Sequence, residues 1–216
     1  ILSSPSGNIN IEFFLSPDGS PSYIVQYEHE NIIDTSSMGF DIKDQPSIAS
    51  GFNIKETVFT SLDENWEMPW GEQRIVNNHY NEMLVKLIEE NEPFRRFNIY
   101  FKAYDDGIGF RYEFPKQEGV DSLIILDENT QFNLTGDHKT WWIPGDWDIY
   151  EHLYNTTKFS EIDAISKRNH RNLAQSYIPE NAVNTPVTMK TERGIYLSFH
   201  EANLTDYAGM TLKIDK

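Results

Sequence analysis

The chain has 216 residues, of which 38% are hydrophobic and 13% are aromatic, so it can bury a substantial core. Its formal net charge of −16 argues against nucleic acid as a partner and against attraction to anionic membranes. The absence of cysteine excludes disulfides, thiolate metal sites and cysteine nucleophiles. We also expect no membrane span, because no apolar run approaches about eighteen residues.

The dominant period along the chain is two, which is typical of β-strands with one buried face. Large apolar residues alternate with polar ones in five stretches: Ile9–Phe13, Phe97–Ala103, Ile108–Phe114, Ile195–Phe199 and Met210–Ile214. Between the second and third stretches, Asp105-Asp106-Gly107 predicts a tight hairpin turn.

Helix-forming segments are scarce. The best short candidate is Ser160–Arg168, in which Ser160 could act as the N-cap. Neither an internal repeat nor a linker rich in glycine and serine is present. We therefore predict an all-β fold with little helix, a large antiparallel β-sandwich of the mutarotase-like super-sandwich kind, forming one domain over residues 1–216.

The segment Gly136–Tyr154 is the most informative part of the chain. It holds three of the five tryptophans, two of the six histidines and four carboxylates, those of Asp137, Asp146, Asp148 and Glu151. Aromatic faces beside carboxylates suit a sugar, because ring C–H groups lie against an indole while hydroxyls bond the acids; the acids also suit a hard cation such as calcium. Alternatively, the segment is a wrapped loop whose tryptophans plug the end of a β-core.

A second aromatic segment, Trp66–Glu72, is followed by the amide-rich stretch Asn77–Glu82. These residues could line a sugar cleft. The interpretation that we favour is an edge region whose tryptophans pack on the sandwich.

His200 and Glu201 follow the predicted strand Ile195–Phe199. If that strand continued, Glu201 would point inward, and a buried carboxylate is costly without a partner. We expect the strand to end first, which leaves Glu201 an ordinary exposed acid.

Several sequence motifs that are common in enzymes are missing. The chain has no glycine-rich nucleotide-binding motif, no Gly-x-Ser-x-Gly and no His-Glu-x-x-His. None of the six histidines has zinc-ligand spacing to another. We interpret them as structural residues, especially His29, His79 and His170.

Seven short motifs occur in an order that resembles the N-terminal β-sandwich domain of glycoside hydrolase family 97. The resemblance covers nearly the whole chain and rests on Ile11–Phe13, Glu64–Glu72, Asn78–Glu82, Asp105–Phe114, Gly136–His138, Trp142–Asp146 and His200–Ala202. Members of that family are α-glucosidases and α-galactosidases, well represented among polysaccharide-using gut Bacteroidetes. The resemblance therefore implies an α-linked oligosaccharide as substrate and a periplasmic or secreted protein. The chain begins at Ile1 without a signal peptide, as a processed or trimmed protein would.

In that family a (β/α)₈ barrel follows this domain and supplies the general acid and the base or nucleophile. We therefore expect no catalytic residue in this chain. The resemblance implies that the domain packs over the active-site face of its own C-terminal catalytic barrel and gives one carboxylate to a calcium ion that barrel glutamates also bind. The match of Gly145–Glu151 to the family motif assigns that calcium-ligand role to Glu151.

Two other functions stay open on the sequence. One is a stand-alone carbohydrate-binding module that uses the same aromatic loops. The other is a mutarotase-like sugar epimerase, which needs a histidine and a carboxylate converging on one sugar. The only adjacent candidates for such a pair are His200 with Glu201 and Glu151 with His152.

Overall fold

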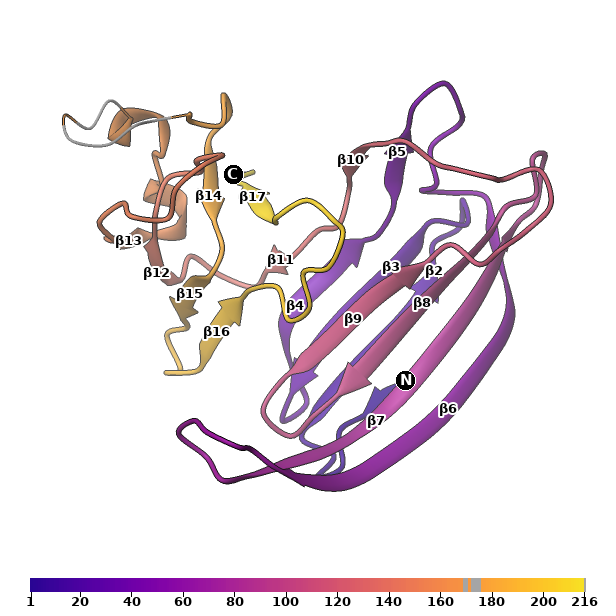
Figure 1. The fold of residues 1–216 in the computed structure, drawn as a ribbon, viewed down its shortest axis with the longest axis horizontal. Helices are drawn as coiled ribbons and strands as arrows, with labels where there is room; N and C mark the ends of the chain where they lie inside the picture. Colours follow the sequence, from indigo (N-terminus) through magenta and orange to yellow (C-terminus); the bar gives the residue numbers. More distant parts are fainter. Residues whose placement is uncertain (169–170, 172–175, 216) are drawn as a thin grey trace. The chain divides into compact units, whose positions relative to one another are not determined.

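The computed structural model describes residues 1–168, 171 and 176–215 (Figure 1). In these residues the chain forms β-strands and two short 3₁₀ turns, Phe159–Glu161 (η1) and Ile165–Lys167 (η2), and no longer helix. The all-β fold class is thus confirmed. Contacts divide the chain into two compact units, residues 1–135 and 136–216, and the single domain over 1–216 stays a prediction.

In the first unit, one antiparallel sheet has the strand order β1-β2-β3-β4-β11. Its strands are Leu2–Ser3 (β1), Ile9–Leu15 (β2), Pro21–Tyr27 (β3), Glu30–Ser37 (β4) and Asn133–Leu134 (β11). A second antiparallel sheet has the order β6-β7-β8-β9, with Phe52–Glu67 (β6), Ile75–Glu89 (β7), Arg96–Ala103 (β8) and Ile108–Glu113 (β9). A short pair joins Phe40–Ile42 (β5) to Ile125–Glu128 (β10).

The two larger sheets of this unit pack face to face around an aromatic core (Figure 1). The Phe101 ring on β8 lies 5.8 Å from the Phe13 ring on β2 and 6.2 Å from the Tyr23 ring on β3. Tyr23 also lies 6.1 Å from Phe110 on β9. Because these contacts join strands of different sheets, they confirm the predicted sandwich of two packed antiparallel sheets.

The hairpin predicted at Asp105–Gly107 is confirmed. It joins β8 to β9, and the Tyr104 N–H donates to the Gly107 carbonyl across 2.8 Å. The predicted alternation also holds along β8, where Phe97, Ile99, Phe101 and Ala103 are fully buried.

The second aromatic segment forms the tip of a long hairpin between β6 and β7. Trp66 is 45% exposed and Trp70 is 82% exposed, so the prediction that these tryptophans pack on the sandwich is wrong. The reason lies in the pairing: β8 reaches β7 only from Asn81 onward, so Ile75–Tyr80 pair with β6 alone and no third strand supports the tip. The prediction of an edge is correct, because β6 is the outer strand of its sheet.

The second unit has a four-stranded sheet of order β13-β12-β15-β16 and a two-stranded pair of β14 with β17. The strands are Lys139–Trp142 (β12), Asn155–Lys158 (β13), Ala182–Asn184 (β14), Val187–Lys190 (β15), Tyr196–Phe199 (β16) and Thr211–Lys213 (β17). Within the described part of the chain, none of the helical segments has the length and apolar character that crossing a bilayer requires.

The helix predicted over Ser160–Arg168 is replaced by η1 and η2. Asn181 accepts the Ala164 N–H at 2.8 Å, which a helix capped by Ser160 would donate to the Ser160 carbonyl, and Asp137 accepts the Ser160 N–H at 2.8 Å. Ser160 therefore lies inside η1 and caps no α-helix.

A buried ion pair closes the turn between β7 and β8. Arg95 is 1% exposed and donates to both carboxylate oxygens of Glu89, from Nε at 2.9 Å and from Nη2 at 2.5 Å. The Arg95 backbone N–H also donates to Glu89, at 2.8 Å. The guanidinium further donates to the Gln45 side chain and to the Ser47 carbonyl, which ties this turn to the segment after β5.

We predict that Glu89→Gln destabilises the protein by about 3–5 kcal/mol, because it leaves the Arg95 charge buried without its counter-charge. Urea denaturation measures the change. Glu56→Gln is the matched control, since Glu56 pairs with Lys86 on the exposed side of the same sheet and should cost little. Equal stability of the Glu89→Gln and Glu56→Gln variants would contradict this account of the turn.

Candidate functional site

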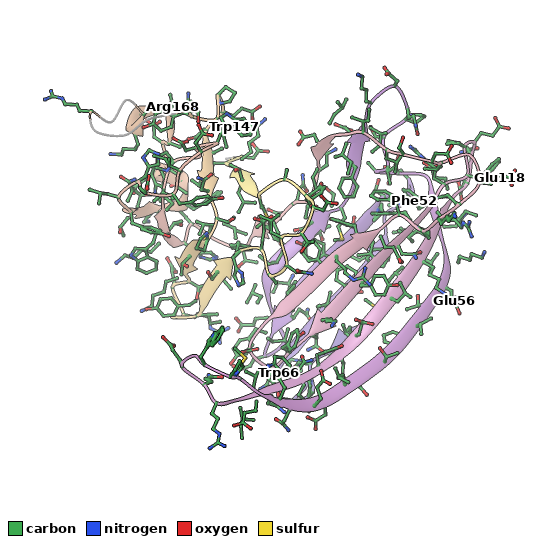
Figure 2. The ribbon with its side chains drawn as sticks, viewed as in Figure 1. Phe52, Glu56, Trp66, Glu118, Trp147 and Arg168 are labelled. Atoms are coloured by element: carbon green, nitrogen blue, oxygen red, sulfur yellow. The ribbon has the colours of Figure 1, made fainter. Side chains whose placement is uncertain are left out.

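The segment Gly136–Tyr154 contributes to both the core and the surface of the second unit. Trp142, at the end of β12, is 1% exposed and donates from Nε1 to the Thr157 hydroxyl at 3.0 Å. Trp147, labelled in Figure 2, is 67% exposed. The two interpretations of this segment thus apply to different residues: one tryptophan fills the core, and another is available on the surface.

Asp146 is the centre of the loop between β12 and β13. The Asp146 side chain is buried, and its Oδ2 lies 3.1 Å from Nε2 of His152, which is also buried. Its Oδ1 accepts the Asp148 N–H at 3.0 Å. Burial alone would raise the pKa of Asp146, but the backbone donors of Asp148 and Ile149 and the His152 ring together hold it below its ordinary value. Asp146 is therefore a charged structural residue.

Asn184 on β14 fixes the same loop from a distant part of the sequence. Its Oδ1 accepts the Asp146 N–H at 3.3 Å, and its Nδ2 donates to the carbonyls of Asp146 at 3.2 Å and Ile149 at 3.4 Å. The Asn184 side chain is fully buried and receives a further hydrogen bond from Thr211. The loop backbone is thus held by one amide at several points.

Three of the four carboxylates in the segment are engaged in hydrogen bonds within the unit. Asp137 accepts from Ser160, Asp146 is held as described, and Asp148 accepts from the Ser176 hydroxyl. Glu151 differs: it is exposed, and its carboxylate has no hydrogen bond or ion pair within the described residues. Among the described residues, Glu151 is therefore the one carboxylate of the segment that has no partner.

Exposed apolar side chains surround Glu151 in the sequence. Tyr150 and Tyr154 are each 56% exposed, and Leu153 is 84% exposed. Over residues 1–168, 171 and 176–215 the structure contains no group of three or more histidines and carboxylates that could hold a metal ion. Glu151 can therefore bind a metal ion only together with ligands from outside the described residues.

The other predicted site residues do not converge. β16 ends at Phe199, so Glu201 lies beyond the strand and is half-exposed, and its carbonyl lies 3.3 Å from Nδ1 of His200. In the second adjacent pair, Nε2 of His152 faces Asp146 in the interior while Glu151 is exposed. Neither pair places a histidine and a carboxylate side by side, as a mutarotase-like mechanism needs.

The burial of His138 was not predicted from the sequence either. His138, just before β12, is 5% exposed, and its Nε2 has no hydrogen-bond partner among the described residues. Burial lowers the pKa of His138 below its ordinary value. His29 and His79 are exposed, and His170 lies outside the described residues.

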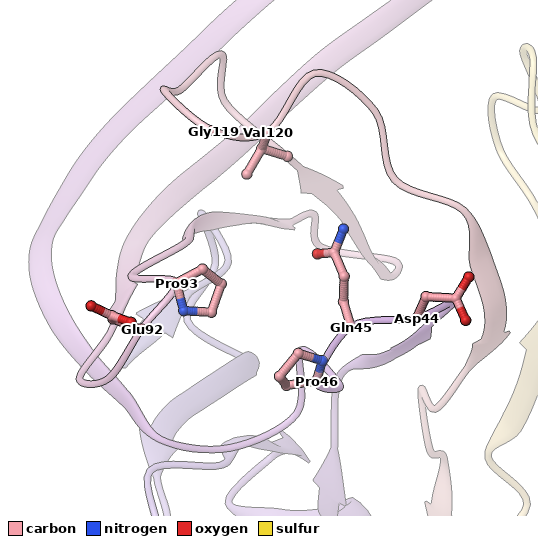
Figure 3. A pocket seen from close by; sticks show the side chains of 7 residues that line it. All are labelled: Asp44, Gln45, Pro46, Glu92, Pro93, Gly119 and Val120. Carbon is pink, nitrogen blue, oxygen red and sulfur yellow. The ribbon is translucent and has the colours of Figure 1, made fainter.

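An open depression in the first unit has a volume of about 400 Å³ (Figure 3). It is lined by Asp44, Gln45, Pro46, Glu92, Pro93, Gly119 and Val120. Gln45 extends into it, whereas the carboxylates of Asp44 and Glu92 lie on opposite sides. Because no aromatic side chain lines this depression, it lacks the flat surface on which a sugar ring would pack.

Comparison with known proteins decides the family. The model of the glycosyl-hydrolase 97 N-terminal family matches residues 2–216. The chain belongs to this family. It is also similar to a glycoside hydrolase family 97 enzyme from Pseudoalteromonas sp. strain K8, at 33% identity. The match covers 98% of this chain and 30% of the enzyme. The TM-score is 0.85 for the enzyme in complex with panose and 0.83 for the complex with acarbose.

The chain thus spans about a third of the length of the family 97 enzyme that it matches. A β-arabinopyranosidase structure matches 98% of this chain and 38% of its own length, at 16% identity and a TM-score of 0.67. That likeness shows a shared fold alone.

We predict that Asn184→Ala destabilises the protein by about 2–3 kcal/mol, because it leaves buried N–H and carbonyl groups of the loop without partners. Thermal or urea denaturation measures the loss. Asn203→Ala is the control, because Asn203 is exposed and accepts a local hydrogen bond from the Thr205 hydroxyl. An Asn184→Ala protein as stable as Asn203→Ala would show that this amide does not hold the loop.

His138 should make stability fall as the pH decreases from 7 to 5. Its pKa is lowered in the folded state, so below about 6.5 the unfolded chain takes up a proton that the folded chain disfavours. The free energy of unfolding then decreases by up to about 1.4 kcal/mol per pH unit. In His138→Gln, urea titrations between these pH values should give a flatter profile, with His79→Gln as the control; an unchanged slope would refute the assignment.

Proposed function

We propose that this chain is the accessory domain of a family 97 α-glycosidase, in which it supplies Glu151 as a ligand to a calcium ion and lines part of the cleft for an α-linked oligosaccharide. In this proposal the two catalytic carboxyl groups of glycoside hydrolysis belong to a C-terminal (β/α)₈ barrel outside this chain. The observation that carries the proposal is the exposed Glu151 carboxylate, which has no hydrogen bond or ion pair within the described residues and follows a loop held by buried hydrogen bonds.

The chemistry of calcium supports Glu151 over its neighbours. Calcium takes six to eight oxygen ligands, several of them carboxylates. Asp146 is buried against His152, and Asp148 accepts from Ser176, so a metal ion would have to displace existing hydrogen bonds to reach either one. Glu151 is free of such bonds within the described residues, and it fits the role of one ligand in a shared set.

A calcium ion bound there would supply positive charge that orients catalytic carboxylates and substrate oxygens. The part of this chain is to present the Glu151 oxygens from a loop that does not need to reorganise. The buried hydrogen bonds of Asp146 and Asn184 provide that rigidity, since the Asn184 side chain binds the loop backbone at both Asp146 and Ile149.

The sugar-cleft part of the proposal rests on the exposed aromatic residues near Glu151. Trp147 is 67% exposed, and Tyr150 and Tyr154 are each 56% exposed. Exposed aromatic faces suit the C–H groups of a sugar ring. The family 97 enzyme from Pseudoalteromonas sp. strain K8 was captured with the saccharides panose and acarbose, which agrees with a saccharide substrate for this protein.

We predict that Glu151→Gln in the complete enzyme weakens calcium binding by at least about tenfold and slows hydrolysis of nitrophenyl α-glucoside or α-galactoside. A neutral amide oxygen replaces a charged ligand, so excess calcium should partly restore the rate. Calorimetry measures the affinity, and initial rates at varied calcium measure the rescue. Glu118→Gln, at an exposed acid of the first unit labelled in Figure 2, is the matched control.

Asp148→Asn and Glu201→Gln separate Glu151 from its rivals. The proposal requires both variants to keep the calcium affinity of the unmodified enzyme. If Glu151→Gln keeps that affinity while Asp148→Asn or Glu201→Gln loses it, the calcium role belongs to the residue whose substitution weakens binding.

A further inference from the structure

The solvent-facing side of the four-stranded sheet in the second unit carries two cross-strand rows of side chains. The pairing register of β13, β12, β15 and β16 places the first row as Lys158, Lys139, Lys190 and Tyr196. The second row is Thr156, Trp141, Thr188 and Ser198. Side chains of paired residues lie on the same face of a sheet, so these eight residues form one surface, called here the lysine–aromatic face.

The opposite side of this sheet is the buried one. Thr140 and Trp142 on β12, Val187 and Met189 on β15, and Leu197 on β16 are all buried. On the lysine–aromatic face, in contrast, Lys139 and Lys158 are exposed and Tyr196 is 61% exposed. Trp141, Thr188 and Lys190 are half-buried, so within the described residues of this unit the lysine–aromatic face is the more exposed side of the sheet.

The charge of this face is opposite to that of the chain. The chain has a net charge of −16, yet three of its 18 basic residues stand directly opposite one another in one row, and neither row contains an acid. Like charges paired across strands destabilise a sheet. Among the described residues, Asp137 approaches Lys158 to 3.9 Å at the margin of the face, which relieves the repulsion among the lysines at that end. An anion between Lys139 and Lys190 would remove it.

Two nearly parallel aromatic rings lie beside these ammonium groups. The centroids of Trp141 and Tyr196 are 6.1 Å apart, with an angle of 18° between the ring planes. Lys139 Nζ lies 5.1 Å from the Trp141 ring, and Lys190 Nζ lies 5.0 Å from the Tyr196 ring. Cations, hydroxyls and aromatic faces thus occur within one small surface, and the Thr188 and Ser198 hydroxyls lie 3.0 Å apart on it.

We propose that the lysine–aromatic face binds a short oligosaccharide that carries carboxylate or sulfate groups. Lys139 and Lys190 would pair with the acidic groups, Thr188 and Ser198 would hydrogen-bond the sugar hydroxyls, and the rings of Trp141 and Tyr196 would pack on its C–H groups. Nucleic acid and anionic membranes do not fit, because the net charge of −16 on the whole chain repels an extended polyanion. A short ligand interacts mainly with the charges that lie within a Debye length of it, which here are those of the lysines.

This site is distinct from the proposed calcium ligand. Glu151 lies on the loop that follows β12 and contributes to neither row of the face. Binding at the lysine–aromatic face should therefore persist in Glu151→Gln, so failure of one proposal does not entail failure of the other.

Calorimetry on the purified protein with three trisaccharides tests the inference: a galacturonic acid trimer, a sulfated galactan trimer and neutral maltotriose. At low salt, about 20 mM, at least one acidic trisaccharide should bind at least about tenfold more tightly than maltotriose, and the difference should shrink at about 200 mM salt. Which acidic trisaccharide binds distinguishes carboxylate from sulfate recognition.

Substitutions locate the binding. Lys139→Gln and Lys190→Gln should each weaken binding of the acidic trisaccharide about threefold to fivefold, as for an exposed charge pair. Tyr196→Ala, at an exposed position, should weaken it similarly through lost ring contact. Lys55→Gln, on the exposed edge strand β6, changes the net charge equally and should have no effect.

Three results would overturn the proposal. They are equal binding of neutral and acidic trisaccharides, equal losses in Lys55→Gln and Lys139→Gln, and binding of inorganic sulfate as tight as that of the sulfated trimer. The last result would mean that the face attracts any anion and does not recognise a sugar.

Discussion

The loop between β12 and β13, the candidate site of this family 97 domain, depends on burying the charge of Asp146. An isolated carboxylate in a protein interior is costly, so the loop must bring donors to it. It does so with the Asp148 N–H and the His152 ring, and the net pKa of Asp146 stays low despite burial. Once these donors are in place, the backbone on either side of Asp146 has little freedom. The positions of the residues that follow are a consequence of this constraint.

The sheet beneath the loop explains how such an irregular segment can be rigid. β12 and β13 are paired up to Trp142 and Asn155, so the loop leaves the sheet and returns to it at adjacent positions. β14 then supplies Asn184. Its side-chain N–H groups donate to the carbonyls of Asp146 and Ile149, and its side-chain oxygen accepts the Asp146 N–H. Beyond β12 the backbone continues to pair with β14, through a bridge of Pro144 to Val183 and the Gly145 N–H to the Ala182 carbonyl, and the hydrogen bonds of the Asn184 side chain add to this pairing.

The fold was predictable because its signal is local. A period of two along β8 and a turn at Asp105–Gly107 are visible in a short window, and the structure agrees with both. Features that depend on partners far away in the sequence could not be predicted. The exposure of Trp66 and Trp70 follows from where β8 stops, and the Ala164 N–H that a helix beginning at Ser160 would use donates to the distant Asn181 side chain.

The same limit applies to the candidate site. The sequence identified the aromatic and acidic segment, but composition could not separate its four carboxylates, and only the family resemblance selected Glu151. The structure separates them by their hydrogen bonds, and two of the partners, Ser160 for Asp137 and Ser176 for Asp148, are far away in the sequence. The pairing of Asp146 with His152 had no local signal either, since residues six apart in an irregular loop have no fixed relation.

A crystal structure of the complete enzyme with calcium tests the central claim most directly, because it shows the ligands themselves. Anomalous scattering locates the ion. The account predicts a Glu151 carboxylate oxygen at about 2.3–2.6 Å from it, with Asp146 still hydrogen-bonded to His152. An ion bound by Asp148 or Glu201, with Glu151 left in solvent, would contradict the account.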